Sequence, residues 1–182
     1  MRVSRVLITI AAAVTLGAGQ DDNPRFTSKN ELIAPANYRE WIWLSSGLGM
    51  SYAAEPSGEP TFDNVFVSPG AYRAFVATGK WPERTMFVLE ERASVSKGSI
   101  NKSGHFQGAL SGLVAEVKDT NRLGGWAFFN LSNSANAAAA LPKSAPCYSC
   151  HAEHGAVDNT FVQFYPTLFE IAKRKGTLRA SY

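Results

Sequence analysis

The run TMFVLEE at residues 85–91 decides the fold. It consists of mainly apolar residues that favour β-strands, followed by two glutamates. Such a run is typical of a strand. A shorter strand is predicted at residues 64–67, and further strands at 113–118 and 125–131, with a turn at 119–122 between the last two. Because these strands follow one another through hairpin-like turns, the sequence predicts an α+β fold, mainly an antiparallel β-sheet with flanking helices.

Helices are expected around this sheet. Ser68 followed by Pro69 provides an N-cap and a favourable first helical position, and Gly79 provides a stop. Residues 159–176 combine spaced apolar side chains with basic residues near their end, which is typical of a C-terminal helix. The alanine-rich stretch at residues 135–140 predicts a short helix ahead of the cysteines.

The motif CYSCH at residues 147–151 contains both cysteines of the chain. Two thiols three residues apart, followed at once by an imidazole, form the attachment motif of a c-type haem. The motif predicts one haem c per chain, attached covalently through Cys147 and Cys150, with His151 as the axial iron ligand. A zinc site would need two further ligands, and only His105 and His154 remain. A redox dithiol would normally follow an early strand rather than lie near the C-terminus.

The sixth coordination position of the iron separates the classes of function. His154 lies one helical turn beyond His151, on the same side of the ring, and no methionine follows the motif. Met50 and Met86 lie in core-like strand sequence, where apolar packing is expected. His105 is the remaining candidate for a sixth ligand. We expect an open face, which favours small-molecule chemistry over simple electron transfer.

The N-terminus has the pattern of an export signal. A short basic segment precedes an apolar run at residues 6–18, so residues 1–19 are predicted to be a secretory signal peptide and the mature protein to be periplasmic. Residues 20–35 are polar and predicted to be a loose arm, and residues 36–182 a single haem-binding domain. No later stretch is apolar enough to span a membrane. The net charge of +3 gives no nucleic-acid-binding footprint.

Several ordered stretches resemble one family. They lie at residues 64–82, 85–90, 96–106, 125–129 and 147–166, and they are similar to the cytochrome P-460 proteins and their relatives, the cytochromes c′-beta. The resemblance covers nearly the whole mature chain. It implies a homodimer of mainly β subunits with a five-coordinate haem, which oxidises hydroxylamine in the first branch and binds nitric oxide and similar diatomic gases in the second.

The resemblance also implies a role for a lysine. Cytochrome P-460 proteins carry a bond between a lysine nitrogen and a meso carbon of the haem, whereas the gas-binding branch lacks this lysine. Lys102 and Lys97 both lie in the matching stretch at residues 96–106. Lys102 is favoured for the cross-link, with Lys97 as the alternative. From the residues alone, both would be solvated lysines on a polar loop.

We expect the strand at residues 125–131 to form the distal wall, which is the wall of the pocket that faces the open side of the haem. Alternation places Ala127 and Phe129 on one face, and the resemblance assigns that face to the haem. Some family members carry a carboxylate there that could shuttle protons, and with Ala127 at that position this chain would lack it. The possible substitutes are Glu90, Glu91 and Glu116.

Together these features predict a periplasmic mono-haem enzyme that oxidises hydroxylamine to a nitrogen oxide, either nitrous or nitric oxide. Its electrons would pass to a separate acceptor, for example another periplasmic cytochrome. One rival is a protein that binds or scavenges nitric oxide on a haem without the cross-link. The other is an electron carrier whose sixth position is closed by His105.

Overall fold

The computed structural model describes residues 22–52, 58–133 and 136–182. The predicted signal peptide, residues 1–19, lies outside these described residues. Within them, no helix has both the length and the apolar character needed to cross a membrane.

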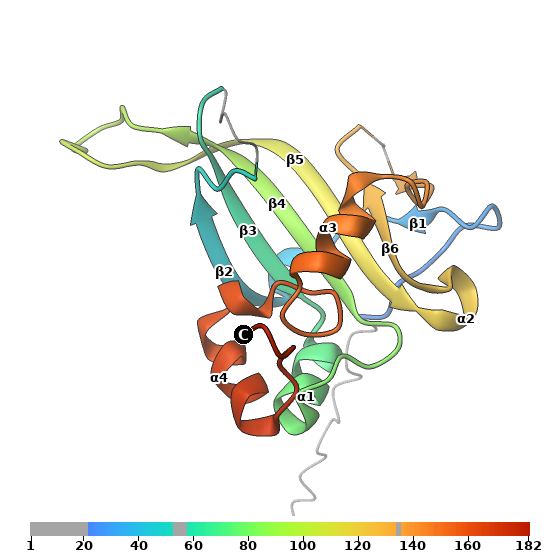
Figure 1. Cartoon of the computed structure of the whole chain (residues 1–182). Helices are drawn as coiled ribbons and strands as arrows, with labels where there is room; N and C mark the ends of the chain where they lie inside the picture. Colours follow the sequence, from blue (N-terminus) through green and yellow to red (C-terminus); the bar gives the residue numbers. More distant parts are fainter. Residues whose placement is uncertain (1–21, 53–57, 134–135) are drawn as a thin grey trace, which may run out of the picture.

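A single five-stranded sheet forms the centre of the molecule (Figure 1). Neighbouring strands are antiparallel throughout, and their order across the sheet is their order along the chain. The predicted α+β fold, mainly antiparallel sheet with flanking helices, is therefore confirmed. The strands are β2 (Ile42–Leu48), β3 (Thr61–Val67), β4 (Met86–Val95), β5 (Phe106–Asp119) and β6 (Gly125–Asn130).

The predicted turn before β6 is a single helical turn, α2 (Thr120–Leu123). The carboxylate of Asp119 accepts a hydrogen bond from the backbone N–H of Arg122 at 2.9 Å, which caps the turn. Gly124 then adopts φ 70°, a left-handed conformation that favours glycine, and ends it. This compact connection lets β6 return beside β5.

The predicted helices at the edges are present with sharper limits. Helix α1 (Pro69–Thr78) follows Ser68 and ends at Gly79, as expected. The C-terminal stretch begins with a 3₁₀ helix, η2 (Val162–Phe164). Helix α4 (Pro166–Lys175) follows and begins at its proline, because proline is well suited to the first position of a helix. The basic last turn of α4 suits the negative end of the helix dipole.

Two short strands correct two expectations. Within the alanine-rich stretch, β7 (Ala137–Ala138) pairs with β1 (Leu32–Ile33), so its described residues, 136–140, form no helix. Alanine favours helices in isolation, but the pairing of β7 with β1, a strand near the N-terminus, overrides that preference. The segment before residue 36 is likewise not a loose arm where it is described, because Leu32 is fully buried in the core.

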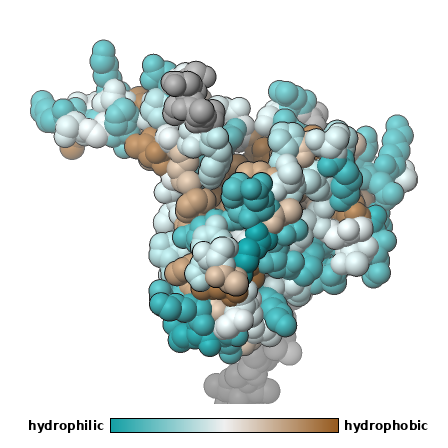
Figure 2. All heavy atoms as spheres, viewed as in Figure 1, coloured by the Kyte–Doolittle hydropathy of each residue, from teal (hydrophilic) through white to brown (hydrophobic). Residues whose placement is uncertain are grey.

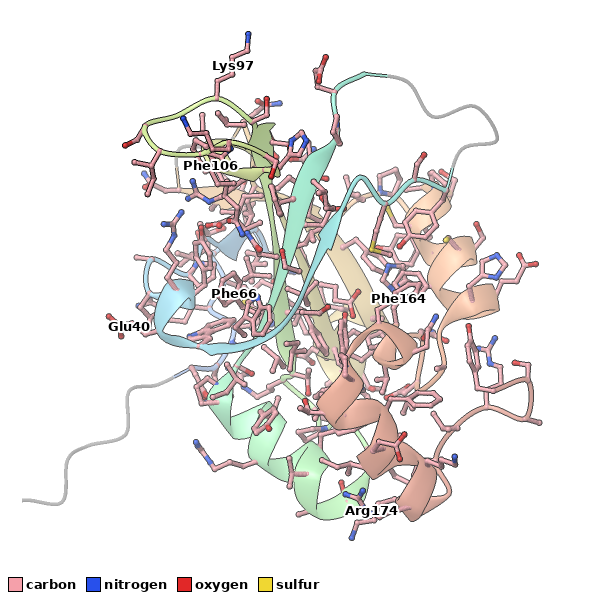
Figure 3. The ribbon with its side chains drawn as sticks, turned by 90° about the vertical axis from the view of Figure 1, so that its left-hand side faces the viewer. Glu40, Phe66, Lys97, Phe106, Phe164 and Arg174 are labelled. Atoms are coloured by element: carbon pink, nitrogen blue, oxygen red, sulfur yellow. The ribbon has the colours of Figure 1, made fainter. Side chains whose placement is uncertain are left out.

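The sheet separates two apolar cores. On one face, here called the α3 face, Phe87 and Trp126 pack with side chains of α1 and α4. On the other, the η1 face, Val88 and Val117 pack with Tyr38 from the 3₁₀ helix η1 (Tyr38–Glu40). Figure 3 shows η1 and the C-terminal helices on opposite sides of the strands.

Helix α3 (Pro146–His154) lies in front of the strands on the α3 face (Figure 1). From the same side, Figure 2 shows hydrophobic residues over the strands, whereas the outer surface of α4 is mainly hydrophilic. The motif CYSCH is therefore carried by a helix that faces an apolar sheet surface.

Candidate haem-binding site

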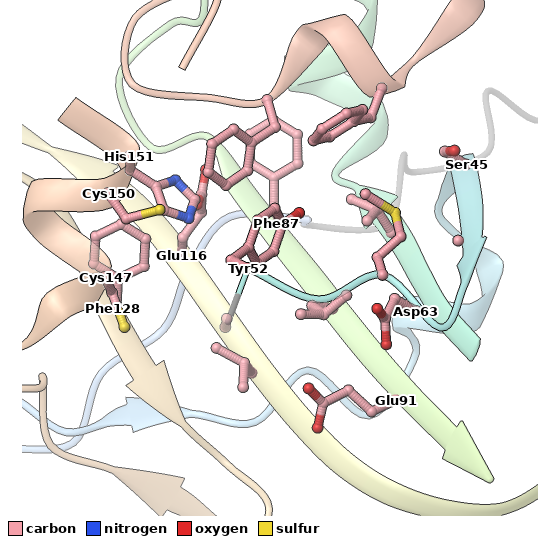
Figure 4. A pocket seen from close by; sticks show the side chains of 18 of the residues that line it. Ser45, Tyr52, Asp63, Phe87, Glu91, Glu116, Phe128, Cys147, Cys150 and His151 are labelled. Atoms are coloured by element: carbon pink, nitrogen blue, oxygen red, sulfur yellow. The ribbon is translucent and has the colours of Figure 1, made fainter. Parts of the chain in front are cut away.

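A cavity of about 580 Å³ lies between α3 and the α3 face of the sheet (Figure 4). Its volume is within the range of cofactor pockets. Strands β2 to β6 provide one wall, and α3 and η2 provide the other. Its lining includes Ser45, Met50, Tyr52, Asp63, Val65, Phe87, Leu89, Glu91, Val114, Glu116, Phe128, Cys147, Cys150, His151, Phe161 and Tyr165.

Helix α3 brings the predicted attachment residues together. Cys147 and Cys150 are three residues apart on a helix, so they share one side of it, and both are free thiols that line the cavity. His151 lines the same cavity. Pro146 at the start of α3 fixes where the helix begins. The structure therefore brings the three predicted residues together in one cavity.

A hydrogen bond fixes the tautomer of His151. Its Nδ1 lies 2.9 Å from the carbonyl oxygen of Asn159, and a carbonyl only accepts, so Nδ1 carries the proton. Nε2 then has the free lone pair that a metal requires. Burial lowers the pKa of His151, partly offset by the bond to Asn159, which keeps the imidazole in the neutral form that binds iron.

Two aromatic rings hold the imidazole. Phe128 lies 4.6 Å from His151 between ring centroids, and Phe161 lies 4.3 Å away. Phe128 also meets Tyr148 of α3 edge-on at 4.9 Å. These contacts leave the ring of His151 little freedom to rotate, so its Nε2 is positioned before any ligand arrives.

The predicted distal wall on β6 is wrong. Ala127 and Phe129 are buried in the core of the η1 face, and Phe128 lines the cavity. Alternation correctly placed Ala127 and Phe129 on a common face, but alternation does not indicate which face meets a ligand. The apolar wall opposite α3 instead comes from β3, β4 and β5, through Val65, Leu89 and Val114.

The structure does not bring the predicted cross-linking lysines to the cavity. Lys97 and Lys102 are exposed in the β4–β5 hairpin, and Figure 3 shows Lys97 pointing into solvent. His105 is also exposed there, with its Nδ1 2.8 Å from Ser94 Oγ, and it does not line the cavity. Among the described residues that line the cavity, none is a lysine or an arginine.

Two of the three substitute carboxylates lie in the cavity. Glu91 and Glu116 line it, whereas Glu90 is buried on the η1 face and forms ion pairs with Arg39 and Arg92. Glu116 Oε2 lies 3.1 Å from Nδ1 of His151, and 12% of the Glu116 side chain is exposed. Burial, with a smaller effect of Asp158, raises the pKa of Glu116 to about 8.

Sequence reasoning missed a third carboxylate, Asp63. Asp63 of β3 is the direct cross-strand partner of Glu91 on β4, and both side chains line the cavity. Burial raises the pKa of both, and the charge of Asp63 adds to the effect on Glu91. Alternation along β3 could have found Asp63, because it shares a face with Val65 and Val67.

The residues of the cavity fit a c-type haem. Two free thiols and a neutral imidazole with an available Nε2 face a mainly apolar space.

The sequence model of the cytochrome P-460 family matches residues 35–162, which includes the whole sheet and the motif. The chain belongs to the cytochrome P-460 family. Membership of the cytochrome P-460 family implies a haem cofactor and its iron. No curated protein matches the sequence.

Proposed function

We propose that this cytochrome P-460 family member is an exported, periplasmic haem c protein that oxidises hydroxylamine to nitrous or nitric oxide. The observation that supports it best is the composition of the cavity. His151 lies at one side, and Asp63 and Glu91 lie at the other (Figure 4). A candidate iron ligand and candidate proton acceptors therefore share one cavity.

The chain's own residues would hold and orient the cofactor. Cys147 and Cys150 would form its thioether bonds, and His151 would ligate iron through Nε2. Asn159 and Phe128 keep that imidazole in place. When bound, the haem supplies an iron that binds hydroxylamine and takes up its electrons.

The carboxylates would accept protons. Each electron that leaves hydroxylamine on the way to nitric oxide is accompanied by a proton, so oxidation requires nearby bases. Glu91 and Asp63 are the bases of the strand wall, whereas Glu116, with a pKa of about 8, already holds its proton at neutral pH. Protons would pass through Glu91 and Asp63 to solvent, while electrons leave to a one-electron acceptor, for example another periplasmic cytochrome.

A second candidate function is reversible binding of nitric oxide or another diatomic gas. The position of the lysines favours it, because Lys97 and Lys102 are exposed in the hairpin. A haem attached only through Cys147 and Cys150 would resemble that of the gas-binding branch. The apolar lining around Val65 and Leu89 would suit a diatomic ligand.

The experiment that separates the two combines mass spectrometry and turnover. Protein matured in a host competent for c-type haem is digested with trypsin, and the haem peptides are weighed. We expect haem on the peptide of Cys147 and Cys150, and a second attached peptide would identify a lysine cross-link. Hydroxylamine consumption is then followed with an artificial one-electron acceptor. Absence of turnover, together with reversible nitric oxide binding, would replace the enzyme proposal with the gas-binding one.

The homodimer implied by the resemblance stays a prediction. The η1 face exposes large apolar side chains on β2 and β5: Trp43 is 57% exposed, Leu48 48% and Leu110 50%. Isolated apolar residues are common on protein surfaces, but several on one sheet face make that face the candidate dimer interface. Sedimentation of the wild-type protein and of a Trp43→Ser variant would test it.

A further inference from the structure

We propose that Asp63 and Glu91 act together as an electrostatic filter, which weakens the binding of anions in the haem cavity and leaves neutral nitrogen–oxygen molecules unaffected. The inference rests on the proposed function, in that the cavity holds the haem, and it names the class of molecule that the cavity accepts. Asp63 and Glu91 together are called the carboxylate pair.

Strand register places the carboxylate pair in the cavity. Asp63 lies directly opposite Glu91, as Val65 lies opposite Leu89, and the side chains of all four line the cavity. On the next strand Gly112 is opposite Glu91, and a Cβ at Gly112 would collide with Glu91 Oε2. The missing side chain at Gly112 therefore leaves the space that the Glu91 carboxylate uses.

Among the described residues that line the cavity, none is a lysine or arginine that could neutralise the carboxylate pair. Like charges directly opposite on neighbouring strands are unfavourable, so such a pair is normally separated or neutralised. Here Asp63 accepts a hydrogen bond at 3.1 Å from the hydroxyl of Thr61. This hydroxyl is neutral, so it does not compensate the negative charge of Asp63. The other ionisable groups of the described lining are carboxyls, thiols, phenols and the imidazole of His151, whose pKa is lowered.

The negative charge of Asp63 affects the pKa of Tyr52, which also lines the cavity. Tyr52 lines the cavity between the strand wall and α3, and its ring stacks on Phe161 at 6.2 Å. Burial raises the pKa of the Tyr52 phenol, and the negative charge of Asp63 raises it further. A potential that disfavours a phenolate at Tyr52 also disfavours any other anion there.

The consequence is a selection by charge. Hydroxylamine and nitric oxide are neutral at neutral pH and meet no repulsion from the carboxylate pair. Nitrite, azide and fluoride are anions, and in a cavity with apolar walls the repulsion is less screened than in water. The cavity would therefore accept neutral nitrogen–oxygen molecules and bind nitrite weakly.

The test measures ligand affinity rather than turnover. Azide is titrated into the ferric holoprotein at neutral pH and low salt, and the visible spectrum reports binding. Glu91→Gln and Asp63→Asn each remove one charge with little change in shape. We expect each to increase azide affinity by on the order of threefold to tenfold. Affinity for nitric oxide, the neutral probe, should not change.

A matched control is Glu40→Gln, which removes the same charge from η1. Glu40 lies on the opposite side of the sheet from the cavity (Figure 3), so this variant should bind azide like the wild type. The filter is wrong if the pair variants also bind azide like the wild type. It is equally wrong if they change affinity for azide and nitric oxide alike, because that would indicate a change of shape.

Salt provides a second measurement that needs no variant. Added salt screens the carboxylate pair, so azide affinity of the wild type should rise with ionic strength. A fall, or no change, would overturn the proposal even if the variants failed to take up haem. A protein that binds azide as expected but does not oxidise hydroxylamine would contradict the proposed function and leave the filter intact.

Discussion

The ring of Phe128 lies 4.6 Å from the imidazole of His151, at an interplanar angle of 62°. This contact joins the edge strand β6 to the helix that carries the attachment motif. It also identifies which face of β6 belongs to the site. The neighbouring Phe129 packs on the opposite face against Phe26, at 6.2 Å.

A pair of alanine substitutions would separate packing from ligation. Phe128→Ala and Phe129→Ala each remove a buried aromatic side chain, so both should lower the free energy of unfolding by about 3 kcal/mol. Only Phe128→Ala frees the ring of His151, so only this variant should shift the visible spectrum of the haem. Denaturant titration and absorption spectra measure the two effects. A spectrum altered equally in Phe129→Ala would show that β6 presents its other face to the haem.

The turn after α3 should not tolerate a side chain at Gly155. A Cβ there would lie 2.6 Å from the carbonyl carbon of Asn159 and 2.7 Å from the carbonyl oxygen of His151. Both are backbone atoms and cannot yield without moving the turn that holds His151. Gly155→Ala should therefore lower the free energy of unfolding by about 3 kcal/mol and weaken the iron–histidine bond.

Resonance Raman spectra of the ferrous protein would report that bond in the Gly155→Ala variant. Gly176→Ala is the control, because nothing lies within 4 Å of a Cβ there. Its φ of 65° is left-handed, so it should lose some stability while keeping the wild-type Raman spectrum. A wild-type Raman spectrum in Gly155→Ala would contradict the role given to the turn.

The buried network on the η1 face should make the protein sensitive to acid. Burial would raise the pKa of Glu90, but the hydrogen bonds from Arg92 and Tyr38 and the charge of Arg39 outweigh it and lower the pKa. The resulting stabilisation is present above the ordinary pKa of a glutamate. It is lost as the pH falls through the lowered value.

Glu90→Gln should therefore cost roughly 3 kcal/mol at neutral pH, because it leaves the guanidinium of Arg92 without its charged partner. The difference from the wild type should shrink toward acidic pH. Thermal unfolding at a series of pH values measures it. Azide and nitric oxide affinities should stay at wild-type values, since Glu90 does not line the cavity. A difference that grows toward acidic pH would contradict this account.

Local pattern was enough to predict the fold and to indicate a candidate attachment motif, because both depend on short-range features. Strand propensity, the Pro69 helix start and the CYSCH motif are each contained in a few consecutive residues. The face of β6 was not predictable in this way, because alternation is the same for both faces. Pairing of β7 with β1 joins segments about a hundred residues apart, which no local propensity reveals. Asp63 was missed because its importance depends on its cross-strand neighbour.

The hairpin lysines supply the sharpest test of the resemblance. Asn101 donates hydrogen bonds to the carbonyl oxygens of Ser96 and Gly104, which holds the tip of the β4–β5 hairpin in a compact turn. Lys97 and Lys102 are both exposed on this turn. Replacing both lysines by methionine should therefore leave the mass of the haem peptide and the visible spectrum unchanged. Loss of an attached peptide or a shifted spectrum would show that the hairpin reaches the haem, either in its own chain or in a second copy.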